Sequence, residues 1–396
     1  MTEIATPTED QREEVFDVLR TSLNLGPTHR DERIAWLPIE QIRCAVEHDR
    51  VVATAAARDF RQWFGGSELA MSGIWGVATL PEHRGSGLAT GLVRALLHEA
   101  KDRGQPISAL YPATLRPYRG LGYELAGTFT LHEIALVDLP AGTAGPLPIE
   151  ELDLSRDLEA VRACYGDSVR HDAGPIDCDD GDWWPQRILG PGWTDEVHRA
   201  VVARGSRGDV EGYAAFTQKK AGGEHDFSFL VECKHLVASS VGGYASLLSY
   251  FRGFRGLGIS VRFVGPPAHP LSYLVEEQRV RPVWTFRWMM RLLDVPASLE
   301  RRGYPPVTDE AVISVEDALF PENRGPWHVL ADEGTVKVER AEGSRGSPIT
   351  IGALSSMFSG FLSPFDAVAL GLLDEEHAAF FARLFAGPAP WMHDFF

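Results

Sequence analysis

The sequence predicts a mixed α/β protein built of more than one domain. Its 396 residues exceed the ~100–200 residues of one ordinary domain. A strand–helix–strand order is expected twice, first over residues 69–111 and again over residues 226–264. Between them lies Leu139–Pro148, a stretch rich in glycine and proline that marks a boundary. The character of the chain changes again near Val283, where an apolar and aromatic stretch begins, so we expect a third domain.

The first repeat opens with a predicted helix. Val15, Leu19 and Leu23 recur at helical spacing, and acidic residues precede them in the first turn. A second helix has one apolar face, and Gly104 is a suitable stop for it. The expected elements are, in order, a helix over Asp10–Leu23, strands over Val51–Phe60 and Leu69–Thr79, a helix over Ser86–Asp102, a strand over Ile107–Tyr111 and a compact turn over Pro117–Gly122.

The remaining two domains are predicted from weaker patterns of the same kind. The second repeat is expected to contain strands over Glu211–Gln218, Asp226–Glu232 and Ile259–Val264, with a helix over Val241–Arg252. The last domain is expected to contain strands over Trp327–Ala331 and Thr335–Glu339, and helices over Ile351–Phe358 and Glu375–Phe385. We therefore predict domains at residues 1–145, 146–285 and 286–396.

Net charge and composition narrow the classes of function. The formal net charge is −17, which repels nucleic acid and anionic membranes and attracts cations. Acidity that only keeps the protein in solution is the alternative explanation. No signal-peptide core and no apolar stretch of ~20 residues is present. We expect a cytoplasmic protein that binds neither nucleic acid nor membrane and acts on a cationic partner.

The cysteine and histidine patterns give no metal site. Cys44, Cys164, Cys178 and Cys233 form no CxxC pair, and the 13 histidines form no HxxxH or HExxH pair. We expect neither a disulfide framework nor a bound metal.

The segment Val77–Thr90 carries the clearest chemical signal. A strand ends there, a turn follows, and a helix begins inside a run that contains Gly85 and Gly87. Glycine lets the backbone approach a ligand closely, and the free N–H groups and dipole of a helix N-terminus favour an anion. Arg84 adds a fixed positive charge. The run lacks the Gly-Lys-Ser/Thr of a Walker A loop, and Thr90 stands where a dinucleotide fingerprint needs its third glycine.

The pattern that remains, Arg84-x-x-Gly87-x-Ala89, resembles the coenzyme A pyrophosphate loop of the GNAT acetyltransferase superfamily. This resemblance implies an acetyl-CoA site at one end of the first domain. The residues that it assigns to the donor are Val77, Ala78, Thr79, Arg84, Gly85, Ser86, Gly87, Leu88, Ala89 and Thr90, and we add Ala113 and Thr114 after the next predicted strand. A glycine-containing turn without a ligand is the alternative.

A second GNAT-like motif follows the loop. Tyr118-Arg119-Gly120-Leu121-Gly122-Tyr123 fits the superfamily pattern Tyr-x-x-x-Gly-Tyr/Phe. The resemblance places the first tyrosine near the coenzyme thiol, where a phenol can protonate the departing thiolate. Tyr118 is therefore the predicted general acid, with a half-buried packing role as the alternative. Tyr123 is expected to pack in the core.

The whole chain resembles the enhanced intracellular survival (Eis) family within this superfamily. The order of the loop, the Tyr118–Tyr123 segment, the stretch Arg287–Ala297 and an aromatic chain end after Pro390-Trp391 carries the resemblance. It implies tandem GNAT-like domains, one active and one degenerate, followed by a sterol-carrier-protein-like α+β domain, and assembly as a homo-hexamer. The stretch His235–Gly243 lacks the loop pattern, so the second domain is expected to bind no coenzyme A.

The chain end is a predicted part of the active site. In the family the C-terminal carboxylate, here on Phe396, is the general base, and an α-carboxylate of pKa ~3.5 stays ionised at neutral pH. A frayed terminus is the alternative. An acidic residue often precedes the final phenylalanine in the family, whereas here Phe395 does and the acid is Asp394. Asp394 and Trp36 are predicted substrate contacts, although a core role for Trp36 is equally open.

The resemblance implies an acetyl-CoA-dependent N-acetyltransferase that acts on a cationic amine by direct transfer in a ternary complex. Aminoglycosides, polyamines and lysine side chains all fit, and the acceptor is not identified by the sequence. Two alternatives stay open. One is a protein that binds acetyl-CoA and an apolar ligand without turnover, and the other is an acyltransferase for a longer acyl-CoA.

Overall fold

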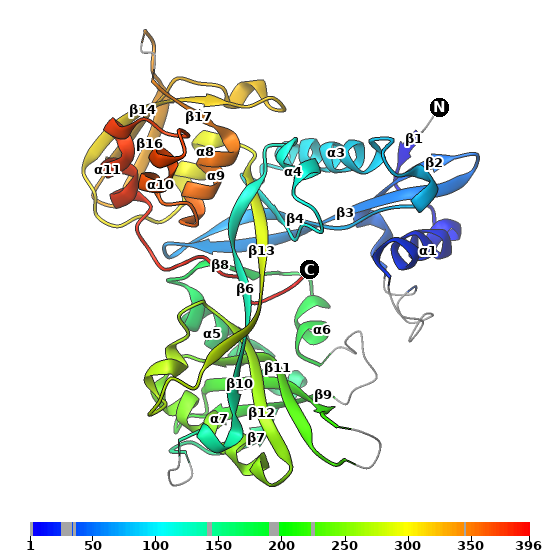
Figure 1. The fold of residues 1–396 in the computed structure, drawn as a ribbon, viewed down its shortest axis with the longest axis vertical. Coiled ribbons are helices and arrows are strands. Elements are labelled where there is room, and N and C mark those ends of the chain that lie inside the picture. Colours follow the sequence, from blue (N-terminus) through cyan, green and yellow to red (C-terminus); the bar gives the residue numbers. More distant parts are fainter. Residues whose placement is uncertain are drawn as a thin grey trace. The chain divides into compact units, whose positions relative to one another are not determined.

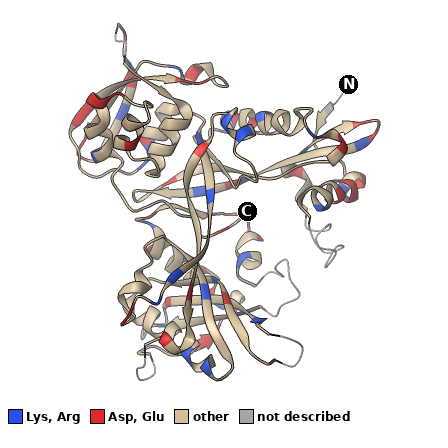
Figure 2. Ribbon diagram, viewed as in Figure 1, with Lys and Arg blue, Asp and Glu red and all other residues tan. Residues whose placement is uncertain are grey.

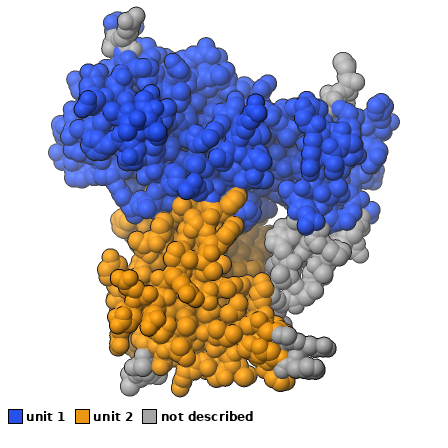
Figure 3. All heavy atoms as spheres, in the orientation of Figure 1, with its two compact units in different colours: residues 1–127, 287–390, 395–396 blue, residues 128–286, 391–394 orange. Residues whose placement is uncertain are grey.

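The computed structural model describes residues 3–24, 34, 37–140, 145–189, 198–222, 226–343 and 346–396. The chain divides into two compact units (Figure 3). Unit 1 contains residues 1–127, 287–390 and 395–396, and unit 2 contains residues 128–286 and 391–394. The last six residues are thus shared between the units. The first and last thirds of the chain fold into one unit, although the sequence separates them by about 160 residues.

Unit 1 begins with a sheet in the order β1-β2-β3-β4-β5-β13. Its hairpin β3–β4 turns at Gly65 and Gly66, both with positive φ, as a tight hairpin requires. The strand β5 pairs parallel to β4, which needs a crossover helix between them. The strands are β1 (Glu3–Ala5), β2 (Ile42–Glu47), β3 (Arg50–Phe64), β4 (Ser67–Thr79), β5 (Ile107–Leu110) and the end of β13 (Arg281–Leu292).

Two amphipathic helices cover this sheet. α1 (Arg12–Leu23) and the crossover helix α3 (Leu88–Asp102) both contact β3 and β4 (Figure 1). α3 buries five apolar residues at helical spacing, which join the core of the sheet: Leu92, Val93, Leu96, Leu97 and Ala100. The short helix α4 (Arg116–Arg119) follows β5. 3-10 turns cover Glu9–Gln11, Ile39–Gln41 and Pro81–His83.

Unit 1 also holds a four-stranded sheet in the order β16-β15-β14-β17. Buried and partly buried residues alternate along β14 from Ala311 to Val315, which is the period of a strand with one buried face. Its elements are α8 (Val295–Arg301), β14 (Asp309–Glu316), β15 (Trp327–Asp332), β16 (Thr335–Arg340), β17 (Ser347–Thr350), α9 (Ile351–Ser359), α10 (Pro364–Ala369) and α11 (Glu375–Leu384), with a 3-10 turn at Pro321–Asn323.

Unit 2 is built on a sheet in the order β6-β12-β11-β10-β9-β7. Its core includes Phe216, Phe251 and Phe263, all at most 1% exposed. The elements are β6 (Glu124–Ala135), β7 (Ile149–Glu151), α5 (Leu154–Val169), β8 (Ala173–Asp177), α6 (Trp183–Leu189), β9 (His198–Arg204), β10 (Val210–Lys220), β11 (Phe229–Ala238), α7 (Val241–Arg252) and β12 (Gly258–Gly265), with 3-10 turns at Leu136–Asp138, Gly253–Gly256 and Pro270–Tyr273.

The two units share one supersecondary plan. In unit 1, β4 is followed by α3 and then by β5, parallel to β4. In unit 2, β11 is followed by α7 and then by β12, parallel to β11. The predicted repeat of strand, helix and strand is therefore confirmed. α7 has its predicted bounds, whereas β11 continues to Ala238, six residues beyond the predicted end of that strand.

Charge and membrane features can be read from the same structure. Acidic and basic residues are interspersed along both units (Figure 2). Among the described residues, no helix is long and apolar enough to cross a membrane.

Candidate active site

The predicted donor segment begins where β4 leaves its neighbour. Pairing between β4 and β5 runs from Met71↔Ile107 to Ile74↔Leu110, while β4 itself continues to Thr79. Just beyond Ile74 the register of β4 against β3 shifts, and Gly76 has φ +58°. Thr54 Oγ1 donates to the carbonyl of Gly76 at 2.9 Å and fixes this bulge. A strand that continues past its partner offers backbone groups to an extended ligand arm.

The turn after β4 ends on an open helix terminus. Gly85 and Gly87 have φ of +82° and +84°, and a methyl group built on either would meet no atom within 4 Å. Gly87 is the N-cap residue of α3, and no side chain caps the helix. The first intrahelical bond is donated by Gly91 N to Gly87 O at 2.9 Å. The N–H groups of the first helical turn are therefore available to a ligand, and the helix dipole favours an anion there.

The side chains around this terminus suit an anionic ligand. Arg84 is exposed beside the turn. Ser86 Oγ donates to the carbonyl of His83 at 2.6 Å, so the hydroxyl stabilises the turn and does not cap the helix. His83 in turn lies 3.2 Å from a carboxylate oxygen of Glu47. Ala113 and Thr114, also predicted for the donor site, are exposed between β5 and α4. The residues present therefore fit a pyrophosphate.

Tyr118 lies on α4 and Tyr123 lies just before β6. Burial raises the pKa of Tyr118 to about 12, so its phenol keeps its proton at neutral pH. Its ring packs edge-on against Tyr123 at 6.2 Å between centroids. Tyr123 is only 1% exposed, and its hydroxyl is 2.6 Å from Ser108 Oγ. One tyrosine of the motif is thus half-buried and protonated, and the other is a core residue.

The last two residues of the chain pack on unit 1. The ring of Phe396 lies 4.9 Å from that of Phe60 on β3 and 5.6 Å from that of Tyr111. The ring of Phe395 stacks on Tyr111 at 4.3 Å. Tyr111 directly follows Leu110, the last residue of β5 that pairs with β4. The chain terminus therefore lies where β4 and β5 separate.

Asp394 occupies a different setting, inside unit 2. Arg187 of α6 donates to both of its carboxylate oxygens, from Nε and from Nη2, each at 2.6 Å. His235 Nε2 lies 3.4 Å from the same carboxylate. Burial alone would raise the pKa of Asp394, but Arg187 and His235 hold it well below its ordinary value. The predicted substrate contact of Asp394 stays a prediction, since both oxygens already have a partner.

The sequence does not identify Arg187 as a partner of Asp394. Arg187 follows two tryptophans in the stretch Asp182-Trp183-Trp184-Pro185-Gln186-Arg187. No local pattern in this stretch indicates a partner 207 residues away. Unit 1 contains the predicted donor segment, Ala113, Thr114, Tyr118 and Phe396, whereas unit 2 contains Asp394. Trp36 lies outside the described residues. Within the described ranges, no group of three His, Cys, Asp or Glu side chains could hold a metal ion.

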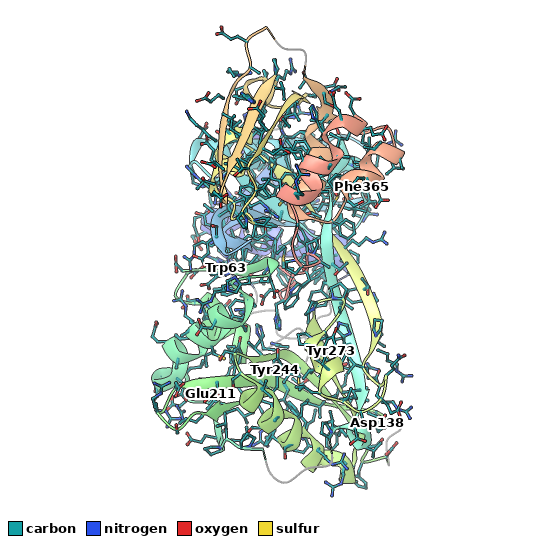
Figure 4. The ribbon with its side chains drawn as sticks, turned by 90° about the vertical axis from the view of Figure 1, so that its left-hand side faces the viewer. Trp63, Asp138, Glu211, Tyr244, Tyr273 and Phe365 are labelled. Carbon is teal, nitrogen blue, oxygen red and sulfur yellow. The ribbon has the colours of Figure 1, made fainter. Side chains whose placement is uncertain are left out.

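The corresponding helix terminus in unit 2 is closed. The N-cap of α7 is Ser240, whose hydroxyl accepts from Gly243 N at 3.0 Å and donates to Glu211 Oε2 at 2.5 Å. Glu211 and Tyr244, the residue that follows Gly243, are labelled in Figure 4. A methyl group on Gly243 would lie 2.2 Å from the backbone oxygen of Glu211. A side-chain cap and an adjacent carboxylate leave this terminus without the open N–H groups and positive potential found at α3.

Unit 1 contains a cavity of about 920 Å³ apart from the donor segment. It is lined by residues 119–125, which follow Tyr118, and by residues of the C-terminal part of the unit, among them Leu319, Ile351 and Leu372. None of the predicted site residues that the structure describes lines it.

Comparison with known families gives three matches along the chain. Residues 3–126 match an acetyltransferase (GNAT) domain, residues 179–292 match a second acetyltransferase (GNAT) domain, and residues 295–393 match a sterol carrier protein domain.

Individual relatives agree over most of the length. An uncharacterized N-acetyltransferase from Streptomyces coelicolor is 27% identical, with 87% of this chain and 86% of that protein covered. The N-acetyltransferase Eis of Mycobacterium tuberculosis is 25% identical, with 79% and 80% covered. The crystal structure of a GCN5-related N-acetyltransferase from Anabaena variabilis superimposes with a TM-score of 0.91 at 27% identity and covers both chains fully.

Proposed function

The chain is a GNAT-type N-acetyltransferase with two GNAT domains and a C-terminal sterol carrier protein domain, and we propose that its first GNAT domain transfers an acetyl group from acetyl-CoA to a cationic amine. The open N-terminus of α3 carries this proposal. Gly87 caps it without a side chain, and Gly85 and Gly87 leave space in front of it. This is a site for the pyrophosphate of an acyl-CoA.

The donor arm would extend from this terminus along β4. Residues Val77–Thr79 lie beyond the last pair between β4 and β5, so their backbone groups can bond a pantetheine arm as an added strand would. Backbone N–H groups at this edge would also bond the acetyl oxygen as negative charge develops on it. Arg84, Ala113 and Thr114 complete the proposed donor site.

The chemical step follows from Tyr118 and the chain end. The amine nitrogen attacks the acetyl carbonyl, a C–N bond forms and the C–S bond breaks. Tyr118, with its pKa raised to about 12 by burial, donates its proton to the departing thiolate. The carboxylate of Phe396 takes the proton of the attacking amine, directly or through water. Phe396 supports this role because its ring packs beside Tyr111, where β4 and β5 separate.

We propose one donor site per chain. In the second GNAT domain, Ser240 caps α7 and the Glu211 carboxylate stands beside the cap. A pyrophosphate at this terminus would displace the cap and meet a like charge, so the second domain would bind no coenzyme A.

The acceptor is proposed to be a small polycation of the aminoglycoside or polyamine type, or a lysine side chain. The net charge of −17 favours such substrates through long-range attraction. We further propose a cytoplasmic homo-hexamer, in keeping with the resemblance to the Eis family.

The test is thiol release from acetyl-CoA across a panel of aminoglycosides, polyamines and lysine peptides. Turnover with a cationic amine and one bound coenzyme per chain is expected. Binding of acetyl-CoA that produces no thiol with any amine would refute catalysis and favour a sensor. Faster turnover with propionyl- or longer-chain CoA would instead identify a different donor.

A chain that lacks Phe396 and a chain with one added C-terminal residue test the proposed base. Each should lower kcat by about 10²-fold or more, the lower end of general base catalysis, with little change in the KM for acetyl-CoA. Unchanged turnover in both chains would rule out the terminal carboxylate.

A further inference from the structure

The C-terminal tail is fixed in unit 2 just before it reaches Phe396. Trp391 N donates to Ala173 O and Met392 N donates to Thr128 O, each at 2.9 Å. Trp391 Nε1 donates to Asp172 Oδ2 at 3.1 Å. Trp391, Met392 and His393 are all at most 4% exposed. A tail held by its backbone and buried to this degree is an ordered part of the fold.

Asp394 ends this ordered stretch at a buried ion pair. The side chain of Arg187 is only 4% exposed, and its guanidinium lies 4.2, 4.4 and 4.3 Å from the ring centroids of Tyr165, Trp183 and Trp184. Three aromatic faces around a guanidinium favour the charged form and hold its plane in one orientation. Two parallel hydrogen bonds from that plane then fix the carboxylate of Asp394.

Two histidines complete the surroundings of the pair. His393 stacks on His235 at 4.4 Å between centroids, with 10° between the planes. His235 Nδ1 is 3.1 Å from the hydroxyl of Tyr213. Burial lowers the pKa of His235 to about 4 and lowers that of His393 well below its ordinary value. Both rings are neutral at pH 7, so one cation, Arg187, faces one anion, Asp394.

Asp394 lies only two residues before Phe396, the last residue of the chain. Consecutive Cα atoms are ~3.8 Å apart, so the Cα of Phe396 lies within about 7.6 Å of that of Asp394. We propose that Arg187 is a positioning residue for acetyl transfer: by holding Asp394 it restricts where the terminal carboxylate of Phe396 can lie. This inference rests on the proposed role of that carboxylate. Under this proposal the second GNAT domain has a structural role, since its residue Arg187 binds the C-terminal tail of the chain.

Four variants test the proposal in the full-length protein. Arg187→Met removes the cation, Arg187→Lys keeps the charge but loses the planar pair of donors, and Asp394→Asn keeps the shape of the anion. Arg204→Met is the matched control, since Arg204 binds the buried carboxylate of Asp157 in unit 2 at 3.0 Å and does not touch the tail. Thermal unfolding first identifies which variants fold, and Asp394→Asn and Arg187→Lys are the mildest.

The first readout is steady-state thiol release. Because a displacement of ~1 Å at a reacting group costs up to ~10²-fold in rate, kcat should fall by about ten- to hundred-fold in Arg187→Met and Asp394→Asn. The KM for acetyl-CoA should change by less than about two-fold, since the proposed donor loop lies at the N-terminus of α3 in unit 1. Arg187→Lys should recover part of kcat. A protein that carries both Arg187→Met and Asp394→Asn should be no slower than the slower single variant, because both changes break the same ion pair. Arg204→Met should keep kcat.

The second readout is release of Phe396 by carboxypeptidase, followed by mass spectrometry. Release should quicken about ten-fold in Arg187→Met and Asp394→Asn, and stay at the wild-type rate in Arg204→Met. Unchanged release in folded variants would show that the pair does not hold the tail and would overturn the inference.

Faster release with unchanged kcat would also overturn it. The chain without Phe396 then locates the failure. If that chain is inactive, the terminal base stands and only the role of Arg187 is wrong. If it is fully active, the proposed base is wrong as well.

Discussion

Replacing Gly73 by alanine tests the position of Phe396 through a contact in unit 1, whereas the Arg187 variants test it through unit 2. Gly73 lies on β4, paired with Ala109 of β5. A methyl group at this position would lie 2.5 Å from the ring of Phe60 and 2.9 Å from Cε2 of Phe396. Carbon atoms pack at ~3.5–4.0 Å, so the ring of Phe60 must retreat by about 1 Å and that of Phe396 by about 0.6 Å.

The size of the effect follows from these displacements. Overpacking of this kind costs ~1–3 kcal/mol of folding free energy, so Gly73→Ala should unfold at a lower temperature but remain folded. If the carboxylate of Phe396 is the base, moving its residue by a good part of 1 Å should reduce kcat by about ten-fold or more. The KM for acetyl-CoA should stay within about two-fold, since Gly73 precedes the donor segment.

The assay is thiol release with a saturating amine, together with thermal unfolding. Gly166→Ala is the control, because Gly166 lies in α5 with no atom within 4 Å of a built methyl group, and a helical Gly→Ala exchange stabilises by up to ~1 kcal/mol. In a chain that already lacks Phe396, Gly73→Ala should lower kcat no further. A folded Gly73→Ala protein with wild-type kcat would show that the position of Phe396 does not affect acetyl transfer. An equal loss of kcat in the shortened chain would show that the loss does not arise through Phe396.

Three further predictions concern single residues. Tyr118→Phe should lower kcat by about 10²–10⁴-fold, measured by thiol release, and should leave the dissociation constant for acetyl-CoA unchanged, measured by calorimetry. A Tyr118→Phe enzyme with wild-type kcat would exclude Tyr118 as the general acid. Arg84→Ala should weaken acetyl-CoA binding by about ten-fold at low salt, since a hydrogen bond to a charged group contributes ~1.5–3 kcal/mol. The loss should be smaller at high salt. A loss that does not depend on salt in titration calorimetry would contradict a charge contact. His235 should make the fold acid-sensitive. In the unfolded chain the imidazole of His235 has the ordinary pKa of 6.5, and in the folded chain its pKa is about 4. The free energy of unfolding therefore falls by about 3 kcal/mol as the pH falls between these values, at ~1.4 kcal/mol per pH unit. Urea unfolding at pH 7, 5.5 and 4.5 measures this, and His235→Gln should lose less stability over the same interval; equal losses in both would show that His235 is not responsible.

The elements of the proposed donor site could be predicted because their residues are contiguous. Arg84, Gly85, Gly87 and the first turn of α3 lie within a few positions of one another, so spacing alone places them on one turn. The helix period of Ser86–Asp102 and the strand before it supplied the context, and the structure has both elements close to their predicted bounds. Local sequence likewise predicted α7 with both ends correct. Interactions between near neighbours in the chain specify such elements.

The surroundings of the chain end depend on residues that no local pattern connects. Arg187 and Asp394 are 207 positions apart, and Phe396 packs on Phe60 and Gly73, more than 300 positions earlier. The partner of Asp394 depends on which helix packs beside it. The packing of the whole of unit 2 determines that this helix is α6, which carries Arg187. The sequence alone thus specified the glycine-containing turn and the helix that follows it. Folding determined that Ser240 and Glu211 close the second helix terminus and that Arg187 holds the tail, because burial and ion pairing arise between segments brought together only in three dimensions.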